Sequence, residues 1–117
     1  MSLADPQNPL AVFCALAVAH ALADFPLQGD YLARQKTRAT AGSIEEWIVA
    51  LTAHSLIHAG AVWLVTGSMI LGAAELVLHA LIDLGKGERK FGLVTDQILH
   101  LSCKAGYAAM LASGMMA

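Results

Sequence analysis

The sequence predicts an all-α protein: a transmembrane bundle of four antiparallel helices, with a short interfacial helix between the first and second spans. Two features predict this class. Apolar residues make up 57% of the 117-residue chain and charged residues only 14%, about half of the charged share in an average soluble domain. The apolar residues also gather into four segments, and a helix needs about 20 such residues to cross a bilayer. We expect residues 1–117 to form a single integral membrane domain.

The four predicted spans are separated by residues that begin or end helices. Ser43 and Glu46 match a capping box directly before the second span. Thr66-Gly67-Ser68 predicts a tight turn, which makes the second and third spans antiparallel neighbours. Glycines separate the third span from the fourth. The predicted spans cover approximately residues 9–24, 47–65, 69–84 and 93–116.

The connection between the first two spans, residues 25–45, carries apolar residues followed by basic ones. These are Leu27, Tyr31 and Leu32, and then Arg34, Lys36 and Arg38. An amphipathic pattern of this kind predicts a short helix that lies in the membrane interface. A solvated basic loop fits the same pattern, so the sequence leaves both structures open.

Basic residues orient the predicted bundle. Six of the seven lie in two connections that face the same side of a four-span chain: Arg34, Lys36, Arg38, Lys86, Arg89 and Lys90. Because basic loops stay in the cytoplasm, both termini are expected outside. Trp47 and Trp63 are spaced to mark the two membrane interfaces. The composition excludes a basic nucleic-acid-binding domain, and the expected partner of so apolar a chain is the lipid bilayer.

Every predicted span also contains polar side chains one helical turn apart. They are His20 and Asp24, His54 and His58, Glu75, His79 and Asp83, and Asp96, His100 and Lys104. Residues four apart share a helix face, so each helix presents one polar stripe. Ionisable groups in a bilayer are costly unless they are paired, ligated or hydrated. We therefore expect the four stripes to converge inside the bundle.

Distances along the helices arrange these residues in layers, at a rise of about 1.5 Å per residue from each cytoplasmic end. The aspartates lie nearest the cytoplasm, and the next layer holds His20, His54, His79 and His100. The deepest layer holds His58, Glu75 and Lys104. Because Glu75 is the only carboxylate at the depth of Lys104, we predict a contact between the two. The alternative is a Lys104 side chain that snorkels or loses its proton.

Imidazole and carboxylate groups in adjacent layers predict a metal site. These ligands suit Zn, and also Mn or Fe, and helical bundles build such sites from facing helices. The predicted ligands are His20, His54, His79, His100, Asp24, Asp83 and Asp96. The aspartates act as ligands, as orienting groups or as the catalytic general base, and the deeper His58 is expected to matter less. The alternative is a buried hydrogen-bond network that holds the helices together.

Four motifs resemble the domain-of-unknown-function family 3307, small multi-span proteins of bacteria and their phages. They are His20-x3-Asp24-Phe25 with Gln28, His54-x3-His58, His79-x3-Asp83-x2-Lys86 and Asp96-Gln97-x2-His100. The resemblance implies a multi-pass protein of the bacterial inner membrane, and it adds Gln28, Gln97 and Lys86 to the buried polar residues of the site. It implies no activity, because the family is named for lacking one.

The pattern is also similar in style to the membrane-bound metal-dependent hydrolases, whose spans carry His and Asp. That likeness favours a metal-dependent hydrolase of a lipid or another membrane-associated substrate. Lys86, Arg89 and Lys90 lie where an anionic head group would arrive, although fixing the topology is an equally good role for them. The rival predictions are a proton or metal-ion transporter or channel, built as a homo-oligomer, and a non-enzymatic protein with a structural polar or metal core.

Overall fold

The structure, a computed structural model, describes residues 5–114. Their secondary structure consists of five helices: α1 (Pro9–Asp24), α2 (Gly29–Gln35), α3 (Ile44–Thr66), α4 (Met69–Gly87) and α5 (Leu93–Ala112). The predicted all-α class is confirmed. α1 has the predicted bounds, whereas α3 begins three residues earlier and α4 ends three residues later than predicted. α5 ends at Ala112, and residues 115–116 of the predicted fourth span lie outside the described residues.

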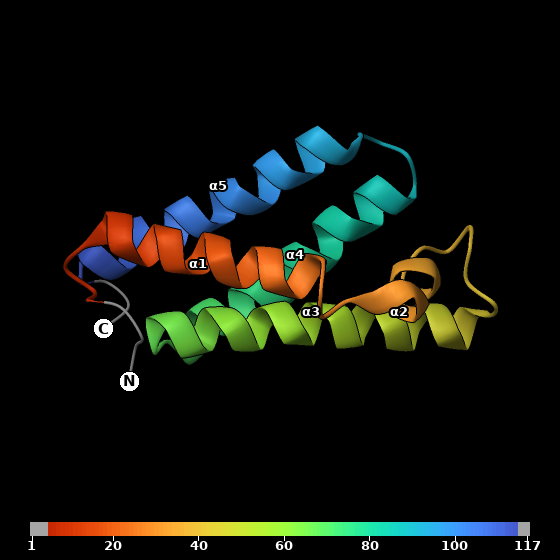
Figure 1. Cartoon of the computed structure of the whole chain (residues 1–117), viewed down its shortest axis with the longest axis horizontal. Helices are drawn as coiled ribbons and strands as arrows, with labels where there is room; N and C mark the ends of the chain where they lie inside the picture. The colour runs from red at the N-terminus through yellow and green to blue at the C-terminus, as the bar shows by residue number, and fades with distance from the viewer. Residues whose placement is uncertain (1–4, 115–117) are drawn as a thin grey trace.

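The four long helices pack in a ring in the order α1, α3, α4, α5, and neighbours in the ring run antiparallel (Figure 1). The chain bends by 87° between α1 and α2. α1 ends beside the middle of α3, and α2 lies beside the earlier part of α3 (Figure 1). Residues 29–35 therefore form a helix. This agrees with the prediction of a short helix in this connection and not with the prediction of a loop.

Local signals place the ends of α3 and α4. The Glu46 amide donates to Ser43 Oγ at 3.1 Å, and the Ser43 hydroxyl donates to the Glu46 carboxylate at 3.4 Å, so the predicted capping box is present. α3 ends at Thr66 and is capped by Gly67, whose φ of 72° is easiest for a residue without a Cβ. Ser68 Oγ then accepts from the Leu71 amide at 3.1 Å and caps α4. This turn makes α3 and α4 the predicted antiparallel pair.

Apolar side chains fill the end of the ring that holds the start of α1 and the end of α5. This apolar core consists of Val12, Leu16, Val62, Val65, Leu71, Tyr107, Ala108 and Leu111. Every long helix contributes to it. Gly72 lets α3 and α4 approach closely here, because a Cβ at this position would lie 3.1 Å from the Ala59 carbonyl oxygen. The apolar core therefore holds the four helices together at one end.

The other half of the bundle interior is polar, while much of the outer surface is apolar. Histidine, carboxylate and lysine side chains from the four long helices are buried there. Large apolar side chains point outward on the same helices, among them Val18, Leu56, Val77 and Ile98, each more than half exposed. The distribution is the reverse of the one that amphipathic helices give a water-soluble bundle.

Among residues 5–114, α3 is the one helix that by itself is long and apolar enough to cross a membrane. α1 and α2 pass the same test only when they are taken together as one bent pair. α1 has 16 residues, and α4 contains the charged residues Glu75, Asp83 and Lys86. The four predicted spans are therefore not confirmed, and the side chains that lower the apolarity of α4 are largely the buried ones.

Candidate metal centre

The histidines and aspartates of the four stripes meet at the centre of the bundle. This group, called the His–Asp cluster below, comprises His20, Asp24, His54, His58, His79, Asp83, Asp96 and His100. Each histidine is at most 3% exposed and each aspartate at most 9%. Because residues four apart lie on one helix face, each long helix turns its whole stripe into the interior.

Asp24, the last residue of α1, joins α1 to α3 and α5. Its Oδ1 lies 2.9 Å from His58 Nε2 and 3.1 Å from His54 Nε2, both on α3. Its Oδ2 accepts from the Gln97 side-chain amide at 3.0 Å and lies 3.3 Å from His20 Nε2. Two imidazole nitrogens thus face a single carboxylate oxygen.

Asp83, near the end of α4, faces histidines of three helices. Its Oδ1 lies 3.2 Å from His100 Nε2, whereas its Oδ2 lies 3.2 Å from His79 Nε2 and 3.5 Å from His54 Nε2. Lys36, which follows α2, donates to the same Oδ2 at 3.2 Å. The two oxygens of one carboxylate therefore connect the α3–α4 side of the cluster to α5.

Asp96 extends the cluster along α5. Its Oδ1 lies 3.3 Å from His100 Nε2 without hydrogen-bond geometry, and its Oδ2 accepts from the Gln97 amide at 3.0 Å. Lys86 Nζ lies 3.9 Å from Asp96 Oδ2. The Gln97 carbonyl oxygen lies 3.0 Å from His20 Nε2, so this amide ties His20 to Asp96.

His79 has the surroundings of a metal ligand. Its Nδ1 lies 3.2 Å from Glu75 Oε2, and its Nε2 lies 3.2 Å from Asp83 Oδ2 outside hydrogen-bond geometry. A histidine that binds a metal through one ring nitrogen commonly donates the other N–H to a carboxylate, which fixes its tautomer and orientation. Glu75 is placed to hold His79 in this way.

Three groups of side chains offer ligand atoms that lie within 4.8 Å of one another: Asp24, His54, His58 and His79; His20, His79 and His100; and Asp83, Asp96 and His100. Two atoms bound tetrahedrally to one zinc ion at about 2.0–2.1 Å are about 3.3 Å apart. The distances from Nε2 to carboxylate oxygen in the cluster, 2.9–3.5 Å, bracket this value. His79 and His100 each belong to two groups, so the donors can serve one ion or two adjacent ions.

A buried ion pair lies between the His–Asp cluster and the apolar core. Lys104 Nζ donates to Glu75 Oε2 at 2.5 Å, and the Tyr107 hydroxyl donates to Glu75 Oε1 at 2.9 Å. Both charged side chains are 1% exposed. The predicted contact between Glu75 and Lys104 is therefore confirmed. Tyr107 was not predicted as a partner, although its position three residues after Lys104 puts both on one helix face.

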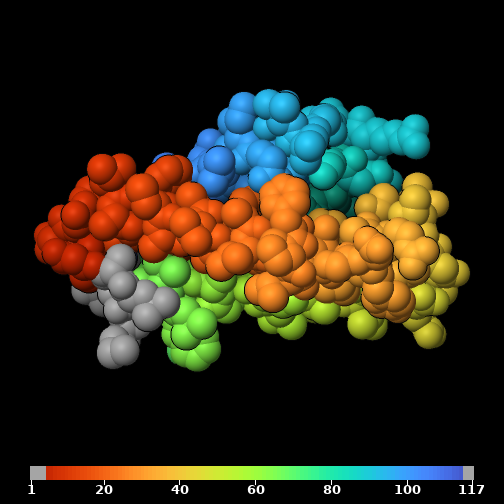
Figure 2. All heavy atoms as spheres, viewed as in Figure 1, coloured from red at the N-terminus to blue at the C-terminus, as the bar shows by residue number. Residues whose placement is uncertain are grey.

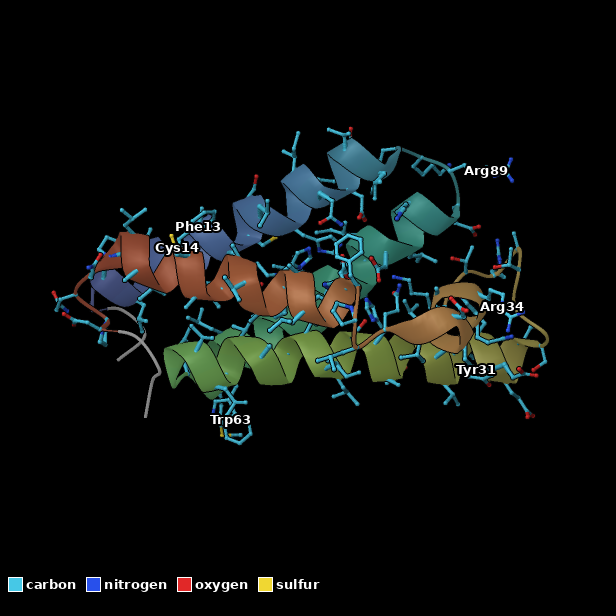
Figure 3. The ribbon with its side chains drawn as sticks, viewed as in Figure 1. Phe13, Cys14, Tyr31, Arg34, Trp63 and Arg89 are labelled. Atoms are coloured by element: carbon cyan, nitrogen blue, oxygen red, sulfur yellow. The ribbon has the colours of Figure 1, made fainter. Side chains whose placement is uncertain are left out.

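A polar pocket of about 270 Å³ lies between α2 and the end of α4 and reaches the cluster at Asp83. This α2–α4 pocket is lined by Gln28, Ala33, Lys36, Thr37, Asp83, Lys86, Gly87 and Arg89. Figure 2 shows α2 and the link before it (orange) on the surface beside the α4–α5 link (teal). Figure 3 places Arg34 of α2 and Arg89 of that link at the same end of the molecule.

A family model described as "Protein of unknown function (DUF3307)" matches residues 12–113. The chain belongs to this family. No curated protein and no solved structure matches it. In this DUF3307 chain, the matched region contains all four motifs that carried the resemblance, and the structure brings their histidines and aspartates into one cluster.

The structure corrects the position of His58. Counting along straight helices places this residue below the metal layer, yet its Nε2 lies 2.9 Å from Asp24 and its ring stacks on His79 at 3.7 Å between centroids. The reason is that α1 ends beside the middle of α3 rather than level with its start (Figure 1). The end of α1 and the start of α3 lie at different depths in the bundle, so residue depths counted from these two points cannot be compared.

The side chains around the α2–α4 pocket differ most from the predictions. Lys36, expected only to fix the topology, is 14% exposed and pairs with Asp83. Lys86, expected to be buried, is 40% exposed at the rim of the pocket. Gln28 lines the pocket with a buried Oε1 that has no hydrogen-bond partner among the described residues. The basic pattern of residues 34–38 was the available signal, but only the packing of α2 shows that Lys36 points inward.

Proposed function

We propose that this chain is a membrane-embedded hydrolase with a divalent transition-metal centre, zinc in the first instance, that opens toward the cytoplasm. The observation that carries the proposal is the environment of His79. Glu75 is placed to hold its Nδ1, while its Nε2 faces Asp83 without a hydrogen bond. This arrangement orients an imidazole for a metal ion. The proposed substrate is a lipid or another anionic molecule attached to the membrane.

Unsatisfied ring nitrogens favour a metal centre over a purely structural network. Among the described residues, no hydrogen-bond partner exists for Nδ1 of His20, His54 and His100 or for Nε2 of His79. A network that served only to hold helices together would satisfy its buried polar atoms. Buried donors and acceptors without partners are expected instead where an ion or water completes the site.

Charge balance supports the same proposal. Among the described residues, one lysine or arginine is hydrogen-bonded to an aspartate of the cluster, namely Lys36 to Asp83, and Lys86 stands 3.9 Å from Asp96. With neutral imidazoles, the buried carboxylates exceed the buried cations, and uncompensated buried charge is costly. A divalent ion would remove the excess. When bound, such an ion supplies Lewis acidity and lowers the pKa of water to about 7.

Asp96 is the proposed general base. Its Oδ1 is buried without a hydrogen-bond partner in the described part of the chain, so a lone pair is free to accept a proton. Gln97 holds the other oxygen, which fixes the orientation of the carboxylate. A positioned carboxylate beside an activated water is the usual partner in metal-assisted hydrolysis.

The closed inner side of the site favours a hydrolase over a transporter or channel. Below the cluster lie the Glu75–Lys104 pair and Tyr107, and then the apolar core. A pathway for protons or metal ions would need polar groups across the whole bundle. The cluster instead meets the α2–α4 pocket at one end, as expected for a site that a substrate enters and leaves from the same side.

The surface supports the proposed membrane location. Apolar side chains cover the outside of the long helices and polar ones are inside, the arrangement expected where lipid is the solvent. Arg34 and Arg89 lie at one end of the molecule, and Trp63 points outward near the other (Figure 3). By the positive-inside rule the pocket end is cytoplasmic and both termini are outside.

The metal content of the purified protein tests the centre itself. We expect about one or two transition-metal ions per chain by elemental analysis in detergent. His79→Ala and His100→Ala should each lower the metal affinity by roughly tenfold or more. Ser102→Ala, on the exposed side of α5, is the matched control and should retain the metal. Folded protein without metal, unchanged by either histidine replacement, would contradict the proposal.

Asp96→Asn separates a hydrolase from a protein with a structural metal. The replacement keeps the shape of the side chain and removes the proton acceptor. Hydrolysis should then fall by roughly 100-fold or more, while metal content and unfolding temperature stay close to those of the wild type. A variant that unfolds at a lower temperature but keeps the wild-type rate of hydrolysis per folded chain would show that Asp96 is structural.

Reporter tags test the membrane orientation. Tags at both termini should report the periplasm, and a tag inserted next to Arg38 should report the cytoplasm. A cytoplasmic N-terminus would overturn the orientation, and with it the cytoplasmic opening of the site.

A further inference from the structure

We infer that the α2–α4 pocket binds the terminal phosphate of a lipid phosphomonoester and presents it to the metal centre. The inference rests on the proposed function, because it names the substrate class of the same site. It adds a role for α2, which builds one wall of the pocket.

The pocket and the cluster share a side chain. Asp83 lines the pocket and contacts His79 and His100 in the cluster. A group seated in the pocket is therefore separated from the proposed metal ligands by one carboxylate. The pocket is in the right place for the part of the substrate that reacts, rather than for a remote part of it.

Three cationic side chains surround the pocket. Lys36, Lys86 and Arg89 line it together with Asp83, so cations outnumber carboxylates there. Lys36 is held by Asp83 and Lys86 stands near Asp96, whereas the Arg89 side chain has no partner within residues 5–114. Ligation of Asp83 by a metal ion would weaken its hold on Lys36 and release that ammonium for an incoming anion.

Backbone strain supports a role for Arg89 in binding. Its φ is 61°, and among the described residues it is the one non-glycine residue with a positive φ. A left-handed conformation is unfavourable for a residue with a Cβ, and such strain is concentrated at functional sites. A glycine would adopt this backbone conformation more easily. The stability of the fold therefore does not explain why an arginine stands at this position.

The charge of the pocket points to a phosphomonoester. A terminal phosphate carries about -1.5 to -2 charges at pH 7, whereas a phosphodiester or a carboxylate carries about one. Three cations beside a divalent centre match the dianion better than the monoanion. Arginine adds a planar fork that binds two phosphate oxygens, and lysine adds a point charge.

The size of the pocket and the surface beside it point to a lipid. A cavity of about 270 Å³ is at the small end for ligand sites, so it holds a head group and leaves the rest of the molecule outside. Phe25 and Leu27, just before Gln28 in the chain, are 63% and 62% exposed. These apolar side chains offer acyl chains a surface next to the pocket.

The proposed reaction balances with water as the one co-reactant. The oxygen of water forms a new bond to phosphorus, and the bond between phosphorus and the ester oxygen breaks. The electron pair of the broken bond stays on the ester oxygen, which takes up one proton of the water and leaves as an alcohol. The other proton remains with the phosphate, so a lipid alcohol and hydrogen phosphate are formed.

Binding of a phosphonate tests the pocket without turnover. Dodecylphosphonate carries a doubly ionisable head group that hydrolysis cannot remove, and its affinity for the as-purified protein can be measured in detergent micelles at a pH high enough to form the dianion. Lys86→Gln and Arg89→Gln should each weaken binding by about tenfold, the usual loss for one charge-assisted contact. Lys90→Gln is the matched control: it removes a basic residue of the same link that does not line the pocket, and binding should stay unchanged. An equal loss in all three variants would overturn the inference, because it would indicate general attraction between charges.

Two further ligands identify the source of the phosphate. Methylphosphonate has the same head group with a methyl group in place of the dodecyl chain, so it should bind at least tenfold more weakly than the dodecyl compound if the acyl surface contributes. Equal affinity would overturn the lipid assignment. Dodecanoate tests the head group, and binding as tight as that of dodecylphosphonate would overturn the phosphate assignment.

Metal analysis of the same samples separates the two proposals. A normal metal content without phosphonate binding would overturn the pocket alone. Selective phosphonate binding by a protein that never holds metal would support the pocket and overturn the metal-dependent hydrolase. Release of phosphate from a short-chain phosphatidic acid, lowered at least tenfold by Arg89→Gln but not by Lys90→Gln, would support both.

Discussion

The two ends of the helix bundle are packed with opposite kinds of side chain. At the end near the start of α1, the residues of the apolar core carry one polar side-chain group, the Tyr107 hydroxyl, which donates to Glu75. At the other end the same four helices enclose the His–Asp cluster, where several buried atoms have no hydrogen-bond partner among the described residues. The four long helices and their antiparallel order are common to both ends, so within the ring the difference lies in the side chains.

This difference separates stability from function. Apolar side chains stabilise a bundle when they fit together closely. A polar interior stabilises it only when every buried polar group also has a hydrogen-bond or ionic partner. The polar end therefore depends on the apolar end to hold its helices in register. Unsatisfied polar groups at one end of an otherwise regular bundle are expected at a functional site. Three sets of replacements test this division. The set with the largest expected effect on the free energy of unfolding lies on the boundary between the two ends.

The Glu75–Lys104 pair should give the largest effect on stability. Lys104→Met leaves a buried carboxylate without its cation and should lower the free energy of unfolding by about 3–5 kcal/mol in detergent. Glu75→Gln leaves the ammonium unpaired and should cost a similar amount. The double variant should lose less than the sum of the two single losses. Strictly additive losses would show that the pair does not act as one unit and would remove the boundary between the two ends.

Leu16→Ala tests the apolar end. Leu16 is 1% exposed in the apolar core, and truncating a buried leucine costs about 2–5 kcal/mol. Metal content per folded chain should not change, because no residue of the cluster is altered. Leu10→Ala provides the control, since Leu10 is 71% exposed on the same helix and its loss should cost less than about 0.5 kcal/mol. A Leu16→Ala protein that stays equally stable but releases its metal would reverse the roles assigned to the two ends.

Arg89→Gly should give the smallest change in the free energy of unfolding, and it should raise this free energy rather than lower it. Relief of the left-handed backbone gains about 1–2 kcal/mol, and the greater freedom of an unfolded glycine returns about 0.5–1 kcal/mol. The net stabilisation should be about 0–1.5 kcal/mol, together with weaker dodecylphosphonate binding. Lys90→Gly should not stabilise the protein, because φ is not positive there. A destabilised Arg89→Gly variant would mean that the arginine supports the fold rather than the pocket.

Several features of the site could be predicted because they depend on spacing along one helix. The stripes follow from residues four apart, as in His20 and Asp24, and the capping box follows from Ser43 and Glu46. The contact between Glu75 and Lys104 follows from two depths in neighbouring antiparallel helices. Other features depend on how helices cross. The contact of His58 with Asp24 could not be predicted, because it requires α1 to end beside the middle of α3.

The sequence by itself determined the helical class, both ends of α1, the starts of α4 and α5, and the histidines and aspartates that turn inward. These properties are local, since caps, turns and helical periodicity involve residues at most a few positions apart. Only the tertiary structure decided which imidazole nitrogen faces which carboxylate, and that Lys36 reaches Asp83 from outside the ring. Those contacts depend on the 87° bend between α1 and α2 and on helix crossings, which arise from packing among side chains far apart in the chain.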